Sequence, residues 1–116
     1  MSAEQKIVPR VTIAIPTYNR AARFLRSAIE SALAQEWTNL EIIVADNCST
    51  DDTEEVVRSY SDARIDYIRH EENIGANNNF NYCLARATGD YFLLLPDDDL
   101  IDHDLVEVCM KAAEGR

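Results

Sequence analysis

Apolar runs typical of strands alternate along the chain with segments of helical period, and this alternation restricts the fold more than any other feature. Val11–Ile15 is β-branched and nearly all apolar, and Pro16 ends it by removing a backbone donor. From Leu25 to Leu33, apolar residues recur at the spacing of one helix face, and Gln35 is expected to stay in water. We therefore expect an α/β fold with a mostly parallel sheet of about four strands flanked by helices.

The other predicted strands are Leu40–Ala45, Ile65–Arg69 and Tyr91–Leu95. Ile65–Arg69 alternates apolar and polar side chains, which predicts a position near the edge of the sheet. Tyr91–Leu95 has no polar alternation, which predicts that both of its faces are covered. A helical stripe runs over residues 80–87, and we expect Gly89 to end that helix in a left-handed conformation.

Length and charge limit the organisation of the chain and its partners. The 116 residues suit a single domain, which we assign to residues 11–116, after a flexible N-terminal segment at 1–10. The formal net charge of −10 argues against nucleic acid as a partner, and it implies that a phosphate-bearing ligand is held with a metal ion. No apolar run approaches the ~20 residues of a membrane helix, and the N-terminus has no secretory signal, so we expect a cytoplasmic protein.

Four loops follow the carboxyl ends of the predicted strands. They span residues 16–20, 46–51, 70–75 and 96–99. In open parallel sheets, ligands bind beyond these ends, at the point where the strand order reverses. Because three of the four loops hold more polar side chains than core packing explains, we expect the ligand site there.

The last of these loops carries three consecutive carboxylates, Asp97, Asp98 and Asp99, directly after an apolar strand. Adjacent carboxylates repel one another and are costly to desolvate, so a positive partner is expected. Mg²⁺ or Mn²⁺ fits, because these ions bind one or two carboxylates together with substrate phosphates. The alternative is a solvated turn, with Asp102 capping the helix that follows.

The four loops resemble, in order, those of the family 2 glycosyltransferases, which are inverting enzymes that use nucleotide-activated sugars. The resemblance covers Val11 to about Val108 and implies the nucleotide-sugar-binding half of a Rossmann-like GT-A fold. Its segments are Ile15-Pro-Thr-Tyr-Asn-Arg20, Val44-Ala-Asp-Asn-Cys-Ser-Thr-Asp-Asp-Thr53, Asn73-Ile-Gly75 and Leu95-Pro-Asp-Asp-Asp99. Many members have an arginine where this chain has Phe80, and the form Asn79-Phe-Asn81 favours enzymes of cell-envelope polysaccharides.

The resemblance also implies roles for single residues. Nucleotide binding is carried over to these positions of the first three loops: Pro16, Thr17, Tyr18, Asn19, Arg20, Asp46, Asn47 and Gly75. The Tyr18 ring is expected to lie against the base, and the Asp46 carboxylate to accept a hydrogen bond from it. For Asp46 a turn-forming role stays open. Arg20 could reach a diphosphate, although a solvated helix start is equally compatible with its position.

In the acidic loop, Asp98 is the first choice as metal ligand. Asp97 is expected to contact the ribose or a metal-bound water. The register is open, because family members often have an acidic residue where this chain has Pro96, so Asp99 stays a candidate metal ligand as well.

The resemblance implies transfer of a sugar from a nucleoside diphosphate sugar, with UDP or dTDP favoured, to a glycan or lipid-linked acceptor. The family places its general base well after the metal loop, so we expect this chain to be truncated and inactive alone. A nucleotide- and metal-binding module is therefore the alternative. A nucleotidyltransferase is less compatible, because residues 16–20 contain no glycine for a phosphate loop. The full-length protein is expected in the cytoplasm, where it could lie against the inner face of the membrane.

One consequence concerns the edge of the sheet. In the family, a later strand pairs beside the strand that leads to the metal loop. Without it, Tyr91–Leu95 would expose unpaired backbone groups, so we expect self-association through this edge.

Overall fold

The computed structural model describes residues 8–20 and 24–114, and it confirms the expected alternation of strands and helices. Residues 1–7 of the expected flexible segment lie outside the described residues. The elements in chain order are β1 (Val11–Thr17), α1 (Arg26–Leu33), β2 (Leu40–Asp46), α2 (Thr53–Arg58), β3 (Ile65–Arg69), α3 (Ala76–Arg86), β4 (Tyr91–Leu94) and α4 (Leu105–Glu114).

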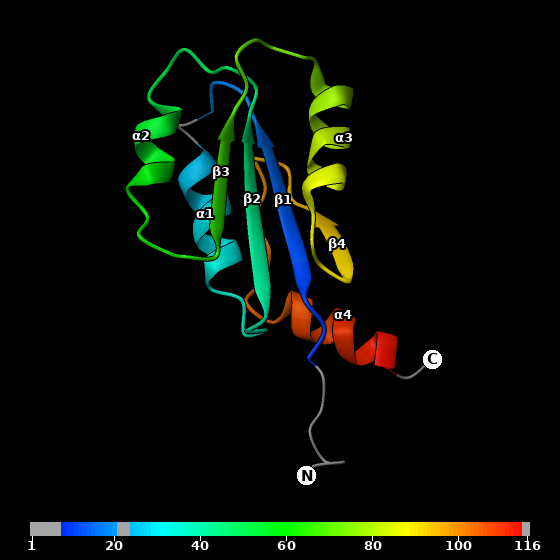
Figure 1. The fold of residues 1–116 in the computed structure, drawn as a ribbon. Helices are drawn as coiled ribbons and strands as arrows, with labels where there is room; N and C mark the ends of the chain where they lie inside the picture. Colours follow the sequence, from blue (N-terminus) through cyan, green and yellow to red (C-terminus); the bar gives the residue numbers. More distant parts are fainter. Residues whose placement is uncertain (1–7, 21–23, 115–116) are drawn as a thin grey trace.

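The four strands form one parallel sheet in the order β3-β2-β1-β4, as Figure 1 shows. The chain steps outward from β1 to β2 and β3, and then returns to the other side of β1 to form β4. The strand order therefore reverses between β1 and β4, and in open parallel sheets this reversal marks the place where ligands bind.

Helices cover both faces of the sheet (Figure 1). On one face, α1, α2 and α4 bury a large core against β1 and β2, which includes Ile13, Ile29 and Val57. On the other face, α3 packs through Cys83 against Ala14 of β1. β1 and β2 are therefore buried on both sides, which explains why their sequences are nearly continuous apolar runs.

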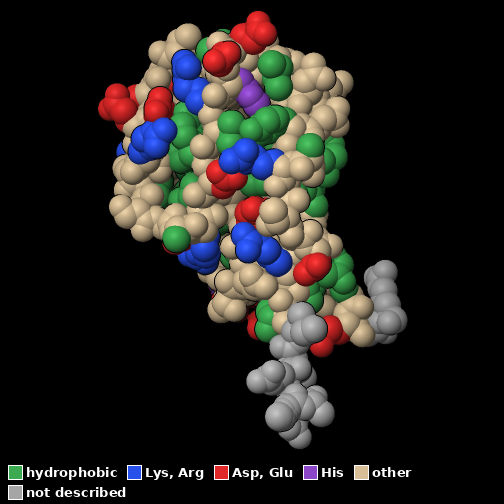
Figure 2. Space-filling view, in the orientation of Figure 1, with side chains coloured by type: hydrophobic (Ala, Val, Ile, Leu, Met, Phe, Trp, Pro, Cys, Tyr) green, Lys and Arg blue, Asp and Glu red, His purple; other side chains and the backbone are tan. Residues whose placement is uncertain are grey.

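β4 differs from the expectation that both of its faces are covered. It pairs with β1 and ends the sheet, and the side chains of Tyr91 and Leu94 are 47% and 43% exposed. The reason is position, because α3 packs over β1 and β2 and leaves part of β4 open. Figure 2 shows hydrophobic side chains at the surface along the margin formed by α3 and β4.

The end of the sheet opposite the expected ligand site is held together by Glu41, which is 8% exposed. Its carboxylate accepts hydrogen bonds from the Thr12 hydroxyl at 2.8 Å, and from the Thr88 N–H and hydroxyl at 2.8 and 3.0 Å. Gly89 lies beside this cluster, and a Cβ there would come within 2.7 Å of the Thr12 nitrogen. Gly89 is thus required for close approach, whereas the expected left-handed conformation is not found.

Two further expectations are corrected in this region. Val8–Arg10 is bound to the body of the protein, because Trp37 Nε1–H donates to Pro9 O at 3.0 Å and Asn39 Nδ2–H donates to Val8 O at 2.8 Å. Gln35 is buried at 6% exposure rather than solvated. Its Oε1 accepts the N–H of Val106 at 3.0 Å. Gln35 therefore caps the first turn of α4, although the two are far apart in the sequence.

Candidate functional site

A cavity of about 340 Å³ opens at the carboxyl ends of β1 and β4, where the strand order reverses. It is bordered by the loops after β1, β2 and β4 and by the start of α3. Its lining residues are Pro16, Thr17, Tyr18, Arg20, Asn47, Ala76, Asn79, Leu94, Pro96 and Asp97. Six of the positions expected to bind nucleotide therefore meet in one place: Pro16, Thr17, Tyr18, Arg20, Asn47 and Asp97.

The cavity contains a buried polar group without a full hydrogen bond. Thr17 is 3% exposed, and its hydroxyl meets no described residue with full hydrogen-bond geometry, although it lies close enough to the Asp97 carboxylate to lower the pKa of Asp97. A buried hydroxyl in this state costs free energy that a bound polar group can recover. Thr17 therefore has the property expected of a ligand-binding residue.

Asp97 is a partly buried carboxylate in the same cavity, and its environment favours a cation. Burial raises the pKa of Asp97, against the opposing effects of the nearby Thr17 hydroxyl, the Arg20 guanidinium and the Tyr18 N–H. Arg20 Nε lies 3.8 Å from Asp97 Oδ1 and is half exposed, so it compensates the charge incompletely. The carboxylate can therefore gain from a second positive partner.

Asp98 and Asp99 lie on the exposed side of this loop. The loop is a turn closed by Asp99 N–H donating to Pro96 O at 3.1 Å, and Asp99 Oδ1 accepts the N–H of Leu100 at 2.9 Å. Nowhere among the described residues do three Asp, Glu, His or Cys side chains form a ready cage for a metal ion. The arrangement suits an ion that takes one or two carboxylates and completes its shell with ligand phosphates and water.

Asp46 lies at the end of β2 and is fully buried. Its Oδ1 accepts the N–H of Ser49 at 2.9 Å, and its Oδ2 accepts the hydroxyl of Tyr67 at 2.6 Å. Burial, followed by the bond to Asp46, raises the pKa of the Tyr67 phenol well above its usual range, so the phenol stays a donor. This geometry is the turn-forming role left open by the sequence, and contact of Asp46 with a base stays a prediction.

Asn19 clamps the first loop to the second. Its Oδ1 accepts the N–H of Thr50 at 2.8 Å and of Asp51 at 3.3 Å, and its own N–H donates to Ser49 Oγ at 2.9 Å. The φ of Asn19 is 54°, a left-handed value that asparagine tolerates better than most residues. In this structure Asn19 shapes the cavity, although it is not one of its lining residues.

The third loop is attached through Asn47, whose Oδ1 accepts the N–H of Ile74 at 2.8 Å. Gly75 follows with a φ of 87°, so it allows the turn into α3 without lining the cavity. No side chain caps the first turn of α3, and Ala76 of that turn borders the cavity. The N-terminus of a helix favours negative charge, which adds to the suitability of this cavity for an anionic ligand.

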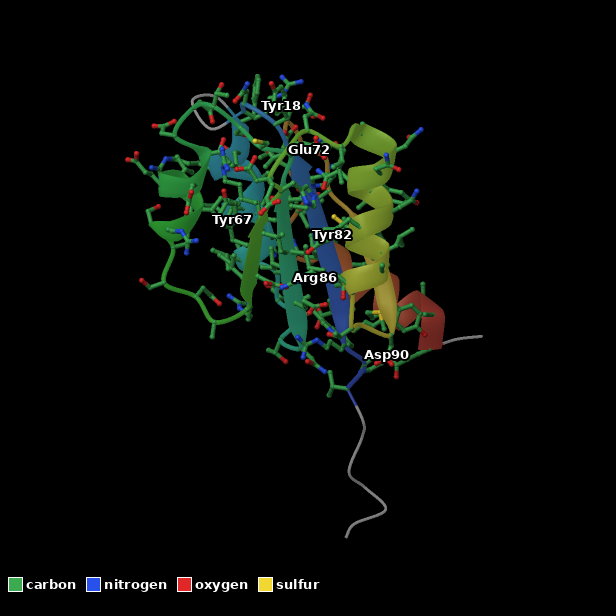
Figure 3. All side chains as sticks on the ribbon, turned by 45° about the horizontal axis from the view of Figure 1, so that its top comes forward. Tyr18, Tyr67, Glu72, Tyr82, Arg86 and Asp90 are labelled. Atoms are coloured by element: carbon green, nitrogen blue, oxygen red, sulfur yellow. The ribbon has the colours of Figure 1, made fainter. Side chains whose placement is uncertain are left out.

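Tyr18 lies at the rim of the cavity and is 45% exposed. Figure 3 shows it near Glu72 at the ligand-binding end, far from Asp90 at the other end of the sheet. An exposed aromatic ring at a cavity mouth is available to stack on a flat ligand. The position agrees with the role expected for Tyr18, which stays a prediction.

Of the lining residues that the sequence did not assign to the site, which are Ala76, Asn79, Leu94 and Pro96, Asn79 is the one with a polar side chain. It lies on α3, is 3% exposed, and interrupts the otherwise apolar face of that helix. A polar residue on the buried face of an expected helix was the signal that could have identified it.

Residues 12–116 match the sequence profile of the family described as "Glycosyl transferase family 2". The chain belongs to glycosyltransferase family 2. This family 2 chain has the four-stranded parallel sheet and flanking helices of Rossmann-like GT-A neighbours, so the fold expected from the resemblance is confirmed.

Several named proteins are similar to the family 2 chain. The GalNAc(5)-diNAcBac-PP-undecaprenol beta-1,3-glucosyltransferase of Campylobacter jejuni is 38% identical over 112 residues, which cover 93% of this chain and 36% of that protein. S. aureus TarS in complex with UDP superposes with a TM-score of 0.85 at 24% identity, covering 91% of this chain and 32% of that one. TarS in complex with UDP-GlcNAc gives 0.78 at 28% identity, with 90% and 30% covered.

A mannosyltransferase from Pyrobaculum calidifontis, solved with GDP-Man and Mn2+, is similar with a TM-score of 0.73 and 30% identity. The match covers 81% of this chain and 29% of that one. The family 2 chain thus spans about a third of the length of these relatives. None of the helices in its described part has the length and apolarity that crossing a bilayer requires.

Proposed function

We propose that this chain binds a nucleoside diphosphate sugar together with a divalent cation, as the donor half of an inverting glycosyltransferase. The observation that carries the proposal is the cavity between β1 and β4, which brings Thr17, Arg20 and Asp97 together at the strand-order reversal. Family membership supplies the reaction class. The relatives solved with UDP-GlcNAc and with GDP-Man support a nucleotide sugar as the ligand.

The chemistry of the cavity fits the parts of such a ligand. Arg20 offers guanidinium N–H groups to phosphate oxygens. The buried Thr17 hydroxyl, whose only contact toward a described residue is the loose one to Asp97, can bond to the ribose or the base. Tyr18 supplies an aromatic face at the rim for stacking. UDP and dTDP are the favoured nucleotides, as expected from the sequence.

A divalent cation would be held by Asp98, with Asp97 or Asp99 as a second ligand or as a partner of its bound water. Asp97 supports a cation at this place, because its carboxylate is partly buried and Arg20 compensates its charge incompletely. When bound, Mn²⁺ or Mg²⁺ supplies charge stabilisation to the departing nucleoside diphosphate. The Mn2+ in the archaeal mannosyltransferase supports this assignment.

The acceptor is proposed to be a glycan or a lipid-linked glycan of the cell envelope. The undecaprenol-linked substrate in the name of the Campylobacter relative supports it. The corresponding location is the cytoplasm, with the whole protein able to lie against the inner face of the membrane. A second copy of the chain, bound through the β4 edge, is proposed as a further partner.

The direct test is calorimetric titration of the chain with UDP, dTDP and GDP, each with and without Mn²⁺. We expect UDP or dTDP to bind in the presence of Mn²⁺ and to bind at least about tenfold more weakly without it. Asp98→Asn should remove most of this metal dependence, whereas Asp104→Asn, in the turn before α4, should leave it unchanged. Nucleotide binding that depends neither on the metal nor on Asp98 would contradict the assignment of the acidic loop to metal binding.

The binding-module alternative has one observation in its favour. Among the described residues that line the cavity, Asp97 is the single carboxylate, and an inverting transfer needs a separate general base. The alternative predicts that this chain binds a nucleotide sugar and leaves it intact. Release of free UDP from UDP-GlcNAc or UDP-glucose in the presence of Mn²⁺ separates the two, because only an active chain produces it above the rate without protein.

A further inference from the structure

Asn79 is a buried polar side chain at the cavity that the loop motifs do not account for. It is 3% exposed and lies with Cys83 on the face of α3 that packs against the sheet. Burying an amide costs free energy unless its hydrogen bonds are made. The partners of the Asn79 amide therefore decide what else it can bind.

The orientation of the Asn79 amide is fixed. Its Nδ2 donates to the backbone carbonyl of Ala45 at 3.0 Å, and a carbonyl can only accept. Oδ1 must then be the atom that faces His70 Nε2 at 2.9 Å, so this nitrogen of the imidazole carries the hydrogen. The two bonds together exclude a flipped amide.

His70 is itself held in place. Its backbone N–H donates to Asp46 O at 2.9 Å, and its ring meets Tyr82 edge to face, with centroids 4.6 Å apart. The Tyr82 hydroxyl accepts a hydrogen bond from Arg86 Nη1 at 3.2 Å, and Arg86 pairs with Asp66 of β3. Figure 3 shows Tyr82 and Arg86 along α3, on the side toward the sheet. His70, which orients Asn79, is thus held by its contact with Tyr82, and Tyr82 is held by Arg86.

The amide has bonding capacity left for a ligand. An asparagine side chain has two N–H donors and two acceptor lone pairs, and protein partners take one of each. Asn79 lines the cavity together with Asn47, whose Oδ1 is taken by Ile74. The side chains of Asn47 and Asn79 carry no formal charge, whereas Arg20 and Asp97 provide charged side chains on the side of β1 and β4.

The charged and the neutral side of the cavity suit different parts of a nucleotide. The diphosphate is charged and belongs with Arg20 and the acidic loop, which leaves the neutral side for the base. A nucleobase edge presents donors and acceptors next to each other, and an oriented amide with one free donor and one free acceptor complements it. We infer that Asn79 is a specificity-determining residue that hydrogen-bonds the nucleobase, and that His70 is the positioning residue that orients it. The inference rests on the proposed nucleotide site.

The first test compares two probes on one variant. Asn79→Ala should weaken UDP binding in Mg²⁺ by about 3- to 10-fold, the effect of losing one or two neutral hydrogen bonds. Inorganic pyrophosphate with Mg²⁺, which has no base, should bind Asn79→Ala as it binds the unmodified chain. Asn81→Ala, an exposed asparagine on the same helix, is the matched control and should affect neither probe.

The second test substitutes His70, which is only half-buried. It therefore does not require that the fold accept alanine at position 79. His70→Phe keeps the ring contact with Tyr82 and removes the N–H, and it should weaken UDP binding about 2- to 5-fold. His70→Gln keeps an N–H donor and should restore most of the affinity. A merely structural role would not predict this difference, and pyrophosphate binding should be equal in all three forms.

The outcomes distinguish a failure of the proposed nucleotide site from a failure of the role of Asn79. If the unmodified chain binds neither UDP nor pyrophosphate, the proposed nucleotide site is wrong and the role of Asn79 with it. If UDP binds the unmodified chain and Asn79→Ala equally well, the site stands and the role of Asn79 is overturned. Equal losses of UDP and pyrophosphate in a folded Asn79→Ala variant would also overturn it, because the residue would then not act on the base.

Discussion

Two non-glycine residues at the cavity loops have left-handed backbone conformations, and they should respond oppositely to glycine. Cys48 has a φ of 68°, and its thiol makes a weak contact to Glu71 O at 3.5 Å. Cys48→Gly should raise the free energy of unfolding by about 0.5 to 1 kcal/mol, because relief of backbone strain exceeds the added entropy of the unfolded chain. Asn19→Gly should lower it by about 1 to 2 kcal/mol, since the bonds of Asn19 Oδ1 are lost.

Urea unfolding of both variants beside the unmodified chain measures these differences. A loss of stability in Cys48→Gly as large as that in Asn19→Gly would mean that the Cys48 side chain, and not its backbone, is what the loop requires. Either result bears on the shape of the second loop, which borders the cavity through Asn47.

At this scale the sequence located the loops that border the cavity but not the contacts that their side chains make. Asp46 was identified as a site residue from its place after a strand, yet its partner Tyr67 lies 21 residues away on another strand. Asn79 was missed for a related reason, because its burial depends on how α3 packs on β2. Partners of this kind follow from the order of strands, which local patterns do not contain.

At the scale of elements, Glu41 joins β2 to β1 and to the turn before β4, and this junction should depend on pH. Burial alone would raise the pKa of Glu41, but hydrogen bonds from Thr88 and Thr12 and the charge of Arg10 outweigh it, so the pKa is lowered. A lowered pKa in the folded state gives stability that is present above the ordinary glutamate pKa and is lost as the pH falls through the folded value. The chain should therefore lose this contribution on acidification.

Glu41→Gln isolates the effect, because the amide cannot accept at both of its terminal atoms. Near neutral pH the variant should be less stable than the unmodified chain by about 1.5 to 3 kcal/mol. The difference should shrink as the pH falls below the ordinary glutamate pKa, because the carboxylate of the unmodified chain then becomes protonated. Thermal unfolding from neutral to acidic pH measures it, and a difference that stays constant with pH would show that the charge of Glu41 does not hold the junction.

Most elements were predictable because hydrophobic period is a local property. β2 and β3 occupy the expected segments within one residue, and β3 lies at an edge as its alternating pattern indicated. β1 was expected to end before Pro16 but continues through it to Thr17, because both residues still pair with β2. The environment of β4 was not predictable, because a short apolar run looks the same at the centre of a sheet and at its edge. Gln35 was misplaced for a similar reason, since its role as a cap depends on where α4 begins.

At the scale of the whole molecule, the β4 edge predicts self-association. The N–H of Tyr91 donates to Arg10 O, just before β1, and the N–H of Leu95 donates to Ala14 O of β1. By alternation, the N–H groups of Phe92 and Leu94 face away from the sheet. Tyr91 and Leu94 are also substantially exposed beside this edge. We expect two copies to pair their β4 strands antiparallel about a twofold axis.

Light scattering over a wide range of protein concentration should show an increase from monomer toward dimer. Tyr91→Lys should shift the chain toward monomer, because a charge at the edge opposes pairing. Glu114→Lys, an exposed change at the end of α4, is the control for added positive charge. A monomer of unchanged size at every concentration would rule out association through β4.

The central claim is that a nucleoside diphosphate and a divalent cation bind together in the cavity between β1 and β4. The most direct measurement is a backbone amide NMR titration with UDP and Mg²⁺, followed by a trace of Mn²⁺ to broaden nearby signals. We predict shift changes at residues 16–20, 46–49, 73–79 and 96–99, with the strongest Mn²⁺ broadening at 96–99. Changes confined to the acidic depression around Asp52, Glu54 and Glu55, or to the opposite end of the sheet around Glu41 and Asp90, would contradict it.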